Sequence, residues 1–395
     1  MSKLQELIQE FCPNGVEWKT IHDVAEIGTG SCNGNEAEEG GVYPFFVRSQ
    51  NIKAKNDFQY DEEAIIIPGE GGIGEIFHYV NGKYALHQRV YRIHFIDKTI
   101  NVKFIYYYMK SNFKSFILKK AVSATVTSIR KPMIEKFEIP IPPLEVQEEI
   151  VKILDRFADY AAELQAELQA RQEQHEFYRD KLLSFNNINK KRGGVIWMKM
   201  SEIGAFIRGN GLQKKDFTES GVPCIHYGQI YTHYGTFASK TKSFVSEETA
   251  GRCKKAHNGD LIFATVSENI EDVCKCVAWL GDGEICISGD SLAFSHNQNP
   301  KYLAYYFQTT VFADYKKTRV TGTKVIRLHQ SKLEQFIVPI PSLAEQQRIV
   351  DILDRFETLT NDLAQGLPAE INAVHEQYKY YRNRLLSFPR NKLSA

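Results

Sequence analysis

The chain has 395 residues, of which 43% are hydrophobic and 25% charged, a composition typical of a folded protein with more than one domain. No apolar run approaches the roughly 18 residues that a transmembrane helix needs. The seven cysteines are irregularly spaced, which argues against a disulfide-stabilised secreted protein. The net charge of +1 does not by itself indicate a nucleic-acid partner. We therefore expect a cytoplasmic multidomain protein.

The sequence contains an internal repeat. IPIPPLEVQEEIVKILDRF at residues 139–157 returns as VPIPSLAEQQRIVDILDRF at 338–356, and FYRDKLLSF at 177–185 returns as YYRNRLLSF at 380–388. Weaker matches precede each repeat, for example GVEW ending at Trp18 and GVIW ending at Trp197. Matches in the same order indicate a tandem duplication, in which a variable region and a repeated helix each occur twice.

The duplication predicts an α+β fold with two mixed α/β globular regions separated by two long helices. Both globular regions mix strand-like runs, such as EAIIIP and DLIFA, with glycine and asparagine turns. Each also has a helical stretch near its end, at 103–120 and 301–317. The expected segments in chain order are an N-terminal helix (1–15), a first globular region (16–140), a first long helix (141–185), a linker (186–193), a second globular region (194–339), a second long helix (340–388, broken near 366–368) and a tail (389–395).

Both long helices carry the heptad pattern of a coiled-coil seam. We predict that they pair with each other as an antiparallel coiled coil, which gives a pseudo-twofold internal repeat and holds the globular regions apart. Arg171 and His175 also fall on the seam, and we favour register control over partner binding for them. The second helix has a four-residue insertion with Gly366 and Pro368, which predicts a kink or a break. The predicted seam comprises Ile150, Leu154, Phe157, Leu164, Leu168, Ile349, Leu353, Phe356 and Leu363.

Basic residues gather near the end of both globular regions. The long helices carry net charges of −5 (144–185) and −2 (343–388), so the rest of the chain carries +8. Within the clusters, Lys and Arg are interleaved with aromatic, Ser and Thr residues, which suits contacts to DNA phosphates. A basic helix face is often only solvated, but its recurrence at the same place in both copies favours the phosphate role. The phosphate candidates are Lys110, Lys114, Lys119, Lys120, Arg130, Lys131, Lys316, Lys317, Arg319, Lys324 and Arg327.

Candidates for reading DNA bases are polar residues at matching places in the two copies. FFVRSQNI in the first region aligns with CIHYGQI in the second, and ALHQR adds a further polar pair. Ordinary polarity of a turn or strand surface is the alternative for each residue. The base-reading candidates are Arg48, Gln50, Asn51, Gln88, Arg89, His226, Tyr227 and Gln229.

Three motifs resemble other kinds of site. GEGGIG at 69–74 fits the GxGxxG pattern, but no amphipathic helix follows it, so we interpret it as a turn in a β-rich region rather than a dinucleotide site. Glu17 and Lys19 match a nuclease Glu-x-Lys without an upstream acidic partner. Cys274 and Cys276, with Cys253, Cys286 and His257, give one ligand pair instead of the two that structural zinc prefers. We therefore expect no catalytic residues and no metal site.

The whole pattern resembles the specificity subunit of type I restriction–modification enzymes. The resemblance rests on the two divergent regions, each followed by the IPIPPLEVQEEIVKILDRF-type block and a helix ending in YRDKLLSF or YRNRLLSF, and it covers nearly the whole chain. It implies two target-recognition domains, each reading one half of a bipartite double-stranded DNA site. It also implies a coiled coil that sets the spacing and docks two adenine methyltransferase subunits, which motor-endonuclease subunits join. S-adenosylmethionine, ATP and magnesium would then belong to those partners.

Two alternatives remain. A coiled-coil scaffold without DNA specificity would bind proteins at both ends, and it would show no salt-sensitive DNA binding. A self-sufficient nuclease or methyltransferase would act alone with metal or S-adenosylmethionine. The sequence contains no GxxxxGK[ST] motif and no amino-methyltransferase signature, which disfavours the enzyme.

Overall fold

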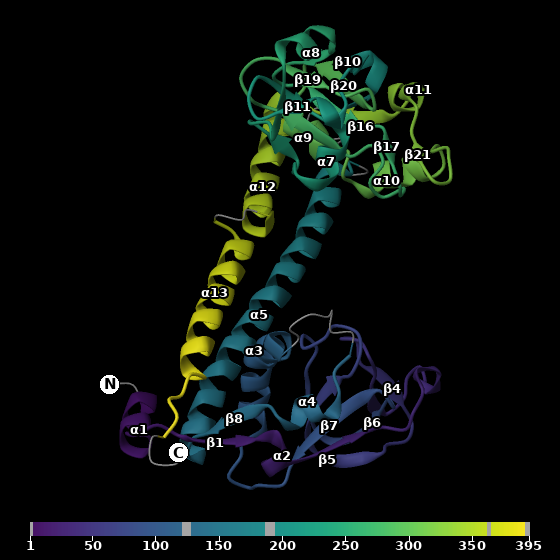
Figure 1. Ribbon diagram of the computed structural model, residues 1–395. Helices are drawn as coiled ribbons and strands as arrows, with labels where there is room; N and C mark the ends of the chain where they lie inside the picture. The colour runs from purple at the N-terminus through teal and green to yellow at the C-terminus, as the bar shows by residue number, and fades with distance from the viewer. Residues whose placement is uncertain (1–2, 121–127, 186–193, 362–364, 392–395) are drawn as a thin grey trace. The chain divides into compact units, whose positions relative to one another are not determined.

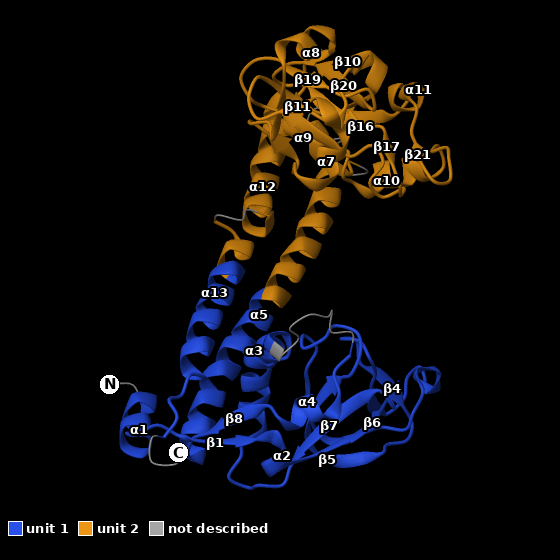
Figure 2. Ribbon diagram, viewed as in Figure 1, with its two compact units in different colours: residues 1–164, 371–395 blue, residues 165–370 orange. Residues whose placement is uncertain are grey.

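The computed structural model describes residues 3–120, 128–185, 194–361 and 365–391 (Figure 1). It divides into two compact units, residues 1–164 with 371–395 and residues 165–370 (Figure 2). Each unit contains one globular region and the helix segments that pack against it. Among the described residues, no helix is long and apolar enough to cross a membrane.

The first unit is built on a six-stranded sheet in the order β2-β7-β5-β6-β3-β4, antiparallel except where β3 runs parallel to β6. A separate antiparallel pair, β1 with β8, leads into the first long helix. The elements are α1 (Lys3–Phe11), β1 (Glu17–Thr20), α2 (Ile21–Val24), β2 (Ala25–Thr29), a 3₁₀ turn (Gly34–Glu36), β3 (Tyr43–Phe46), β4 (Lys53–Lys55), β5 (Tyr60–Pro68), β6 (His78–Leu86), β7 (Val90–Phe95), α3 (Val102–Lys120), α4 (Lys131–Glu135), β8 (Glu138–Ile141), the first half of α5 (Leu144–Leu183) and most of α13 (Leu367–Leu385).

The sheet of the first unit has a core on each face. Successive side chains of a strand point to opposite faces, so Ile65 and Ile67 of β5 pack in the core that contains α3, whereas Ala64 and Ile66 pack in a smaller core on the other face. This is why the apolar run EAIIIP forms a strand that is buried on both sides.

The second unit has two five-stranded sheets, in the orders β10-β20-β16-β18-β13 and β11-β14-β12-β19-β15. The pair β9 with β22 repeats the arrangement of β1 with β8. The elements are the second half of α5, β9 (Ile196–Lys199), α6 (Met200–Ile203), β10 (Gly204–Arg208), a 3₁₀ turn (Lys214–Asp216), β11 (Phe217–Thr218), β12 (Val222–Ile225), α7 (Tyr227–Thr232), β13 (Phe237–Ala238), β14 (Ser243–Val245), α8 (Glu247–Arg252), β15 (Lys255–Ala256), β16 (Leu261–Ala264), β17 (Val266–Ser267), β18 (Cys276–Trp279), β19 (Ile285–Ile287), β20 (Ser291–His296), α9 (Pro300–Tyr306), α10 (Thr310–Lys317), β21 (Ile326–Arg327), α11 (Gln330–Glu334), β22 (Ile337–Ile340) and α12 (Leu343–Asn361).

Alternation along β16 again separates two cores. Leu261 and Phe263 face the core that contains α9, and Ile262 and Ala264 face the core shared with the other sheet. The helical stretch predicted at 301–317 is two helices rather than one, α9 and α10. Thr309 between them has an extended backbone (φ −72°, ψ 158°) and its hydroxyl donates to the Tyr306 carbonyl, so the first helix ends and a second begins.

A buried glutamine of the repeated block attaches each long helix to its own globular region. In the first unit, the Gln147 side chain accepts a hydrogen bond from the Asn101 backbone N–H (2.8 Å) and donates to the carbonyls of Thr99 and Pro142 (2.9 and 2.6 Å). In the second unit, Gln346 accepts from the Asn299 N–H (2.9 Å) and donates to the Pro341 carbonyl (2.9 Å). Both glutamines are completely buried.

An aspartate of the same block makes a second repeated attachment. Asp155 accepts from the Lys103 ammonium (2.7 Å) and the Tyr107 hydroxyl (2.6 Å) of α3. Asp354 accepts from Lys301 (2.7 Å) and Tyr305 (2.8 Å) of α9. These contacts explain physically why LEVQ…ILDRF and LAEQ…ILDRF recur in the sequence.

The long helices pair antiparallel within each unit, as predicted. In the first unit, the Phe157 ring of α5 lies 6.2 Å from Tyr378 and 5.7 Å from Tyr381 of α13. In the second unit, His175 and Tyr178 of α5 stack on Phe356 of α12, with ring centroids 6.0 and 5.7 Å apart. The α+β fold class, with a duplicated globular region and a paired helix, is therefore confirmed.

The residues of the predicted seam differ in burial. Ile150, Leu154, Leu164, Ile349 and Leu353 are buried; Phe157, Leu168 and Phe356 are half-buried; and Leu363 lies outside the described residues.

Helix α12 ends at Asn361 and α13 begins at Leu367. The Gly366 carbonyl accepts the first hydrogen bonds of α13, from the N–H groups of Ala369 and Glu370. Pro368 therefore lies in the first turn, where its missing N–H costs nothing.

Candidate nucleic-acid interface

The structure brings together two of the base-reading candidates of the first region, Arg48 and Arg89. Both guanidinium groups donate to the carboxylate of Glu70, from Arg48 Nη1 at 2.9 Å and from Arg89 Nη1 at 2.8 and 2.9 Å. The hydrogen bonds from Arg89 and, to a smaller extent, the one from Arg48 hold the pKa of Glu70 below its usual value. The side chains of Arg48, Arg89 and Glu70 remain 48%, 56% and 36% exposed, respectively, so a ligand can reach them. We call Arg48, Glu70 and Arg89 the arginine–glutamate cluster.

Glu70 belongs to the glycine-rich motif at 69–74, which connects β5 to the antiparallel β6. The next element after the motif is the strand β6 rather than a helix, so its interpretation as a turn in a β-rich region is confirmed. Sequence reasoning set the motif aside and missed Glu70. Its position between Gly69 and Gly71 gives no hint of the two arginines, which lie 22 and 19 residues away in the chain.

The other base-reading candidates of the first region are also at the surface. Gln50 and Asn51 are exposed in the loop after β3. The Gln88 side chain donates to the Asn33 side-chain oxygen (3.0 Å), which joins the β6–β7 turn to the loop after β2. Arg48, Gln50 and Asn51 therefore occupy one loop, and Gln88 and Arg89 a neighbouring one.

The phosphate candidates of the first region lie on α3 and at the start of α4. Lys110 lies over the Tyr106 ring, and Lys114 pairs with Glu75 and lowers the pKa of that carboxyl group. Lys119, Arg130 and Lys131 are exposed. Lys120 is the last residue of α3, and its side chain lies outside the described residues, as do residues 121–127. Lys103, at the start of the predicted helical stretch 103–120, is instead one of the helix attachments described above.

In the second region, the base-reading candidates divide into two groups. His226 and Tyr227 line a hollow of about 340 Å³, together with Lys214, Ser288 and Asp290. Burial lowers the pKa of His226. Its ring nitrogen Nδ1 accepts from the Gly228 N–H (3.2 Å) and so caps α7.

Gln229 aligns in sequence with the exposed Gln50, but it is 9% exposed. Its side-chain oxygen accepts from the His226 N–H and its nitrogen donates to Ser243. Because the amide is used internally, we remove Gln229 from the base-reading set.

The basic candidates of the second region have different surroundings. Lys317 pairs with Asp314 (2.9 Å), Arg319 stacks on the Tyr315 ring (3.9 Å to its centroid), and Lys324 is exposed. Arg327 pairs with Asp290 (3.4 Å), which also lines the hollow beside His226 and Tyr227. The sequence reading did not include Lys214 and Lys215, two exposed lysines next to that hollow. Their adjacency after the glycines at 209 and 211 was the available signal.

Lys316 does not fit the phosphate role. It is 7% exposed, and its ammonium group donates to the carbonyl oxygens of Glu271 (2.6 Å) and Val273 (3.0 Å). Burial lowers the pKa of Lys316. Lys316 follows the buried Phe312 by one turn of α10, so both side chains lie on the inward face of the helix, and we remove Lys316 from the phosphate candidates.

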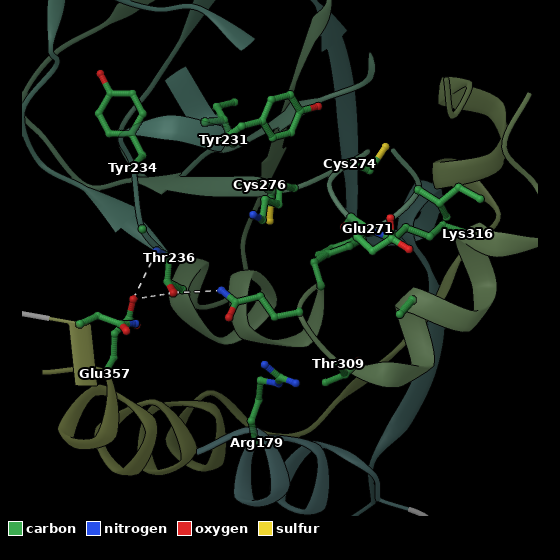
Figure 3. Close-up of a pocket in the computed structure, with 18 of the residues that line it drawn as sticks. Arg179, Tyr231, Tyr234, Thr236, Glu271, Cys274, Cys276, Thr309, Lys316 and Glu357 are labelled. Carbon is green, nitrogen blue, oxygen red and sulfur yellow. Dashed lines mark hydrogen bonds between the residues drawn. The ribbon is translucent and has the colours of Figure 1, made fainter. Parts of the chain in front are cut away.

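A cavity of about 610 Å³ lies within the second unit, where α5 and α12 meet the globular region (Figure 3). The Thr236 hydroxyl donates to Glu357 of α12 (2.7 Å) and accepts from the Gln308 amide (2.9 Å). Arg179 points into the cavity from α5, and its Nε donates to Asp180 (3.0 Å). The hydrogen bond between Thr236 and Glu357 in the wall of this cavity attaches α12 to the second region.

The cysteines considered for zinc lie in separate cores. Cys274 and Cys276 pack in the core that contains α9, whereas Cys253 packs with Cys224 of β12 and Cys286 of the neighbouring strand β19 in another core. The described residues contain no group of three or more His, Cys, Asp or Glu side chains placed to hold a metal ion.

A family model for the type I restriction modification DNA specificity domain matches residues 13–174 and, a second time, residues 195–373. The chain belongs to this family. The two matches follow the duplication, and each covers one globular region with its repeated helix.

Specificity subunits from two bacteria illustrate the relationship. The chain is 32% identical over 305 residues to the type I restriction enzyme EcoR124I/EcoR124II specificity subunit of Escherichia coli, covering 74% of this chain and 72% of that protein. It is 29% identical over 401 residues to a putative specificity subunit of Haemophilus influenzae, covering 94% and 96%. The chain is thus a type I specificity subunit, as the sequence resemblance implied, and nothing in these comparisons favours a scaffold.

Two solved structures share the fold. The S subunit of a type I restriction–modification system from M. genitalium aligns with a TM-score of 0.56 at 16% identity, covering 94% of this chain and 96% of that one. A chain from a study of complex assembly and conformational transition of the type I R-M system aligns with a TM-score of 0.63 at 14% identity, covering 95% and 98%. The duplicated α/β architecture with paired helices is therefore the fold of this family.

Proposed function

We propose that the two globular regions are target-recognition domains that each read one half of a bipartite DNA site. The observation that carries this proposal is the contrast within the duplication. Gln147 and Gln346 share two attachments, because each accepts from an asparagine N–H and donates to a proline carbonyl, whereas the exposed polar clusters of the two regions differ. Two different readers on a repeated frame suit a target whose halves have different sequences.

Phosphate contacts would come from exposed basic residues around these clusters. In the first region these are Lys110, Lys114, Lys119, Arg130 and Lys131, and in the second they are Lys317, Arg319 and Lys324, to which we add Lys214 and Lys215. The half-buried Arg327 and Lys120, whose side chain lies outside the described residues, remain phosphate candidates as well. Such contacts supply affinity without sequence preference, whereas His226, Tyr227 and the arginine–glutamate cluster would supply the preference.

The paired helices would set the separation of the half-sites and dock two methyltransferase subunits. Their net negative charge makes them poor surfaces for phosphates, and their repeated sequence offers two similar partners equivalent surfaces. In the assembled complex, adenine methylation and ATP-dependent cleavage would be the work of the methyltransferase and motor-endonuclease subunits. S-adenosylmethionine, ATP and magnesium would act there, and this chain would contribute no catalytic group.

The test is salt-dependent DNA binding by the full chain together with its methyltransferase subunit. We expect the logarithm of affinity to fall linearly with the logarithm of salt concentration. The double variant Lys119→Ala, Lys120→Ala should weaken binding to all sequences and lower the slope by roughly 0.9 for each phosphate that is no longer neutralised. A coiled-coil scaffold without DNA specificity predicts no salt-sensitive binding. Weaker discrimination at unchanged affinity in the double variant would contradict the phosphate role.

A further inference from the structure

The arginine–glutamate cluster leaves one edge of each guanidinium group free. Both arginines donate to Glu70 through Nη1. Within the described part of the chain, Nε and Nη2 of Arg48 and of Arg89 have no hydrogen-bond partner. Because a guanidinium group is planar, a carboxylate bound at Nη1 fixes the direction in which the remaining N–H groups point.

The backbone around the cluster is held in place by the glycine-rich turn. The Gly69 N–H donates to the Arg89 carbonyl (2.9 Å), and the Gly69 carbonyl accepts from the Ile129 N–H (2.7 Å). Gly71 has a φ of +75°, and a Cβ at this position would lie 3.0 Å from the Arg48 carbonyl oxygen. The turn therefore packs against the backbone of both arginine-bearing loops, which restricts how far their side chains can move.

The charge of the cluster favours a base over a phosphate as its ligand. A carboxylate between two guanidinium groups reduces their combined charge and repels a phosphate at short range. A guanine edge in the major groove instead presents two neutral acceptors, O6 and N7, which match two parallel N–H groups of arginine.

We propose that Arg48 and Arg89 read guanine in the half-site of the first region, and that Glu70 is the positioning residue that orients both guanidinium groups. This inference rests on the proposed function, because it assumes that the first region faces DNA bases. It assigns a chemical identity to part of the target: the half-site read by residues 16–140 contains at least one G·C pair.

The experiment selects preferred sites from a randomised duplex library with the full chain in complex with its methyltransferase subunit. Arg89→Lys and Arg48→Lys keep the positive charge but lose the planar fork. Each should lower the preference for one G·C pair of the first half-site by roughly 5- to 150-fold, the range of a good bidentate contact. Glu70→Gln should relax the same position while binding to unrelated sequences stays equal or tightens. The second half-site should not change in any variant.

Glu26→Gln is the matched control. Glu26 is an exposed carboxylate on β2, in the six-stranded sheet of the first unit, and it pairs with Arg92 (3.5 Å). Its loss removes a comparable charge pair and should leave the base preferences unchanged.

Two results would overturn the assignment while the proposed function stands. One is a selected bipartite motif whose first half contains no G·C pair. The other is an even loss of affinity on all sequences with unchanged base preferences. If the wild-type chain selects no bipartite motif at all, the proposed function fails and this assignment fails with it.

Discussion

The two units bind their long helices through the same side chains, but their outer surfaces share little. Gln147 and Asp155 hold α5 to the first region, and Gln346 and Asp354 hold α12 to the second through equivalent atoms. The first region has a single six-stranded sheet with an arginine–glutamate cluster, whereas the second has two five-stranded sheets and a hollow lined by His226. The repeat therefore preserves the attachment of helix to globular region, and the copies diverge in the parts that we propose to face DNA.

The largest expected effect comes from exchanging one reader on the shared frame. Replacing residues 16–140 with the corresponding region of another type I specificity subunit should replace one half of the recognised motif and leave the other half unchanged. The measurement is the motif selected by the complex from a randomised library. A change in both halves would mean that the two regions do not read DNA independently.

Truncating the buried glutamines tests whether the two attachments are energetically equal. Gln147→Ala and Gln346→Ala should each cost about 3 kcal/mol, because buried backbone groups lose their partners. Denaturant unfolding gives the free energy, and hydrogen exchange shows which unit opens. Gln172→Ala, at an exposed position of α5, is the control and should change stability by less than about 0.5 kcal/mol. A loss in one unit only would break the equivalence.

Acid should destabilise the second unit through His296. Burial lowers the pKa of His296 from 6.5 to about 4. Its Nδ1 accepts from the Gln298 N–H (3.1 Å), and Nε2 has no partner within the described residues. Between pH 6.5 and pH 4 this histidine is protonated in the unfolded chain but stays neutral in the folded unit. The free energy of unfolding is therefore unaffected by His296 above pH 6.5 and falls by roughly 3 kcal/mol towards pH 4.

The equivalent strand position in the first unit suggests a substitution for this test. His296 lies opposite Gly204 in the second unit, at the place where Phe95 lies opposite Ala25 in the first. His296→Phe should therefore flatten the pH dependence of unfolding between pH 6.5 and 4. An unchanged slope would assign the acid sensitivity to other groups.

The smallest expected effect separates the two aspartate attachments. Asp155→Ala should cost about 2 kcal/mol because the buried Tyr107 hydroxyl loses its acceptor, and Asp354→Ala about 1 kcal/mol because Tyr305 keeps a second acceptor. That acceptor is Glu357, 2.6 Å from the Tyr305 hydroxyl. Tyr305→Phe in the Asp354→Ala background should remove this difference. Equal losses in the two single variants would show that Glu357 does not compensate.

The duplicated framework was predictable because its signal is local and occurs twice. The repeated block predicts the long helices, and the heptad spacing predicts their pairing, which the contacts of Phe157 and Phe356 with the opposite helix confirm. The insertion at 366–368 likewise pointed to the place where α13 begins as a separate helix.

The site was less predictable because burial and partner choice depend on the tertiary structure. Lys316 lies in the same basic cluster as the exposed Lys317, yet its ammonium group lies against two backbone carbonyls. Gln229 aligns with Gln50 in sequence but caps a short helix internally. Glu70 contacts Arg48 and Arg89 because the fold brings three loops together, and no residue spacing in the sequence predicts that arrangement.

The most direct test of the two-reader account is base-resolution adenine methylation in a host that expresses this chain with its methyltransferase subunit, compared with the methyltransferase alone. The account predicts a bipartite motif that is methylated only when this chain is present, with one half that changes when residues 16–140 are exchanged. Methylation of the same sites without the chain, or no new methylation from a purified and assembled complex, would contradict it.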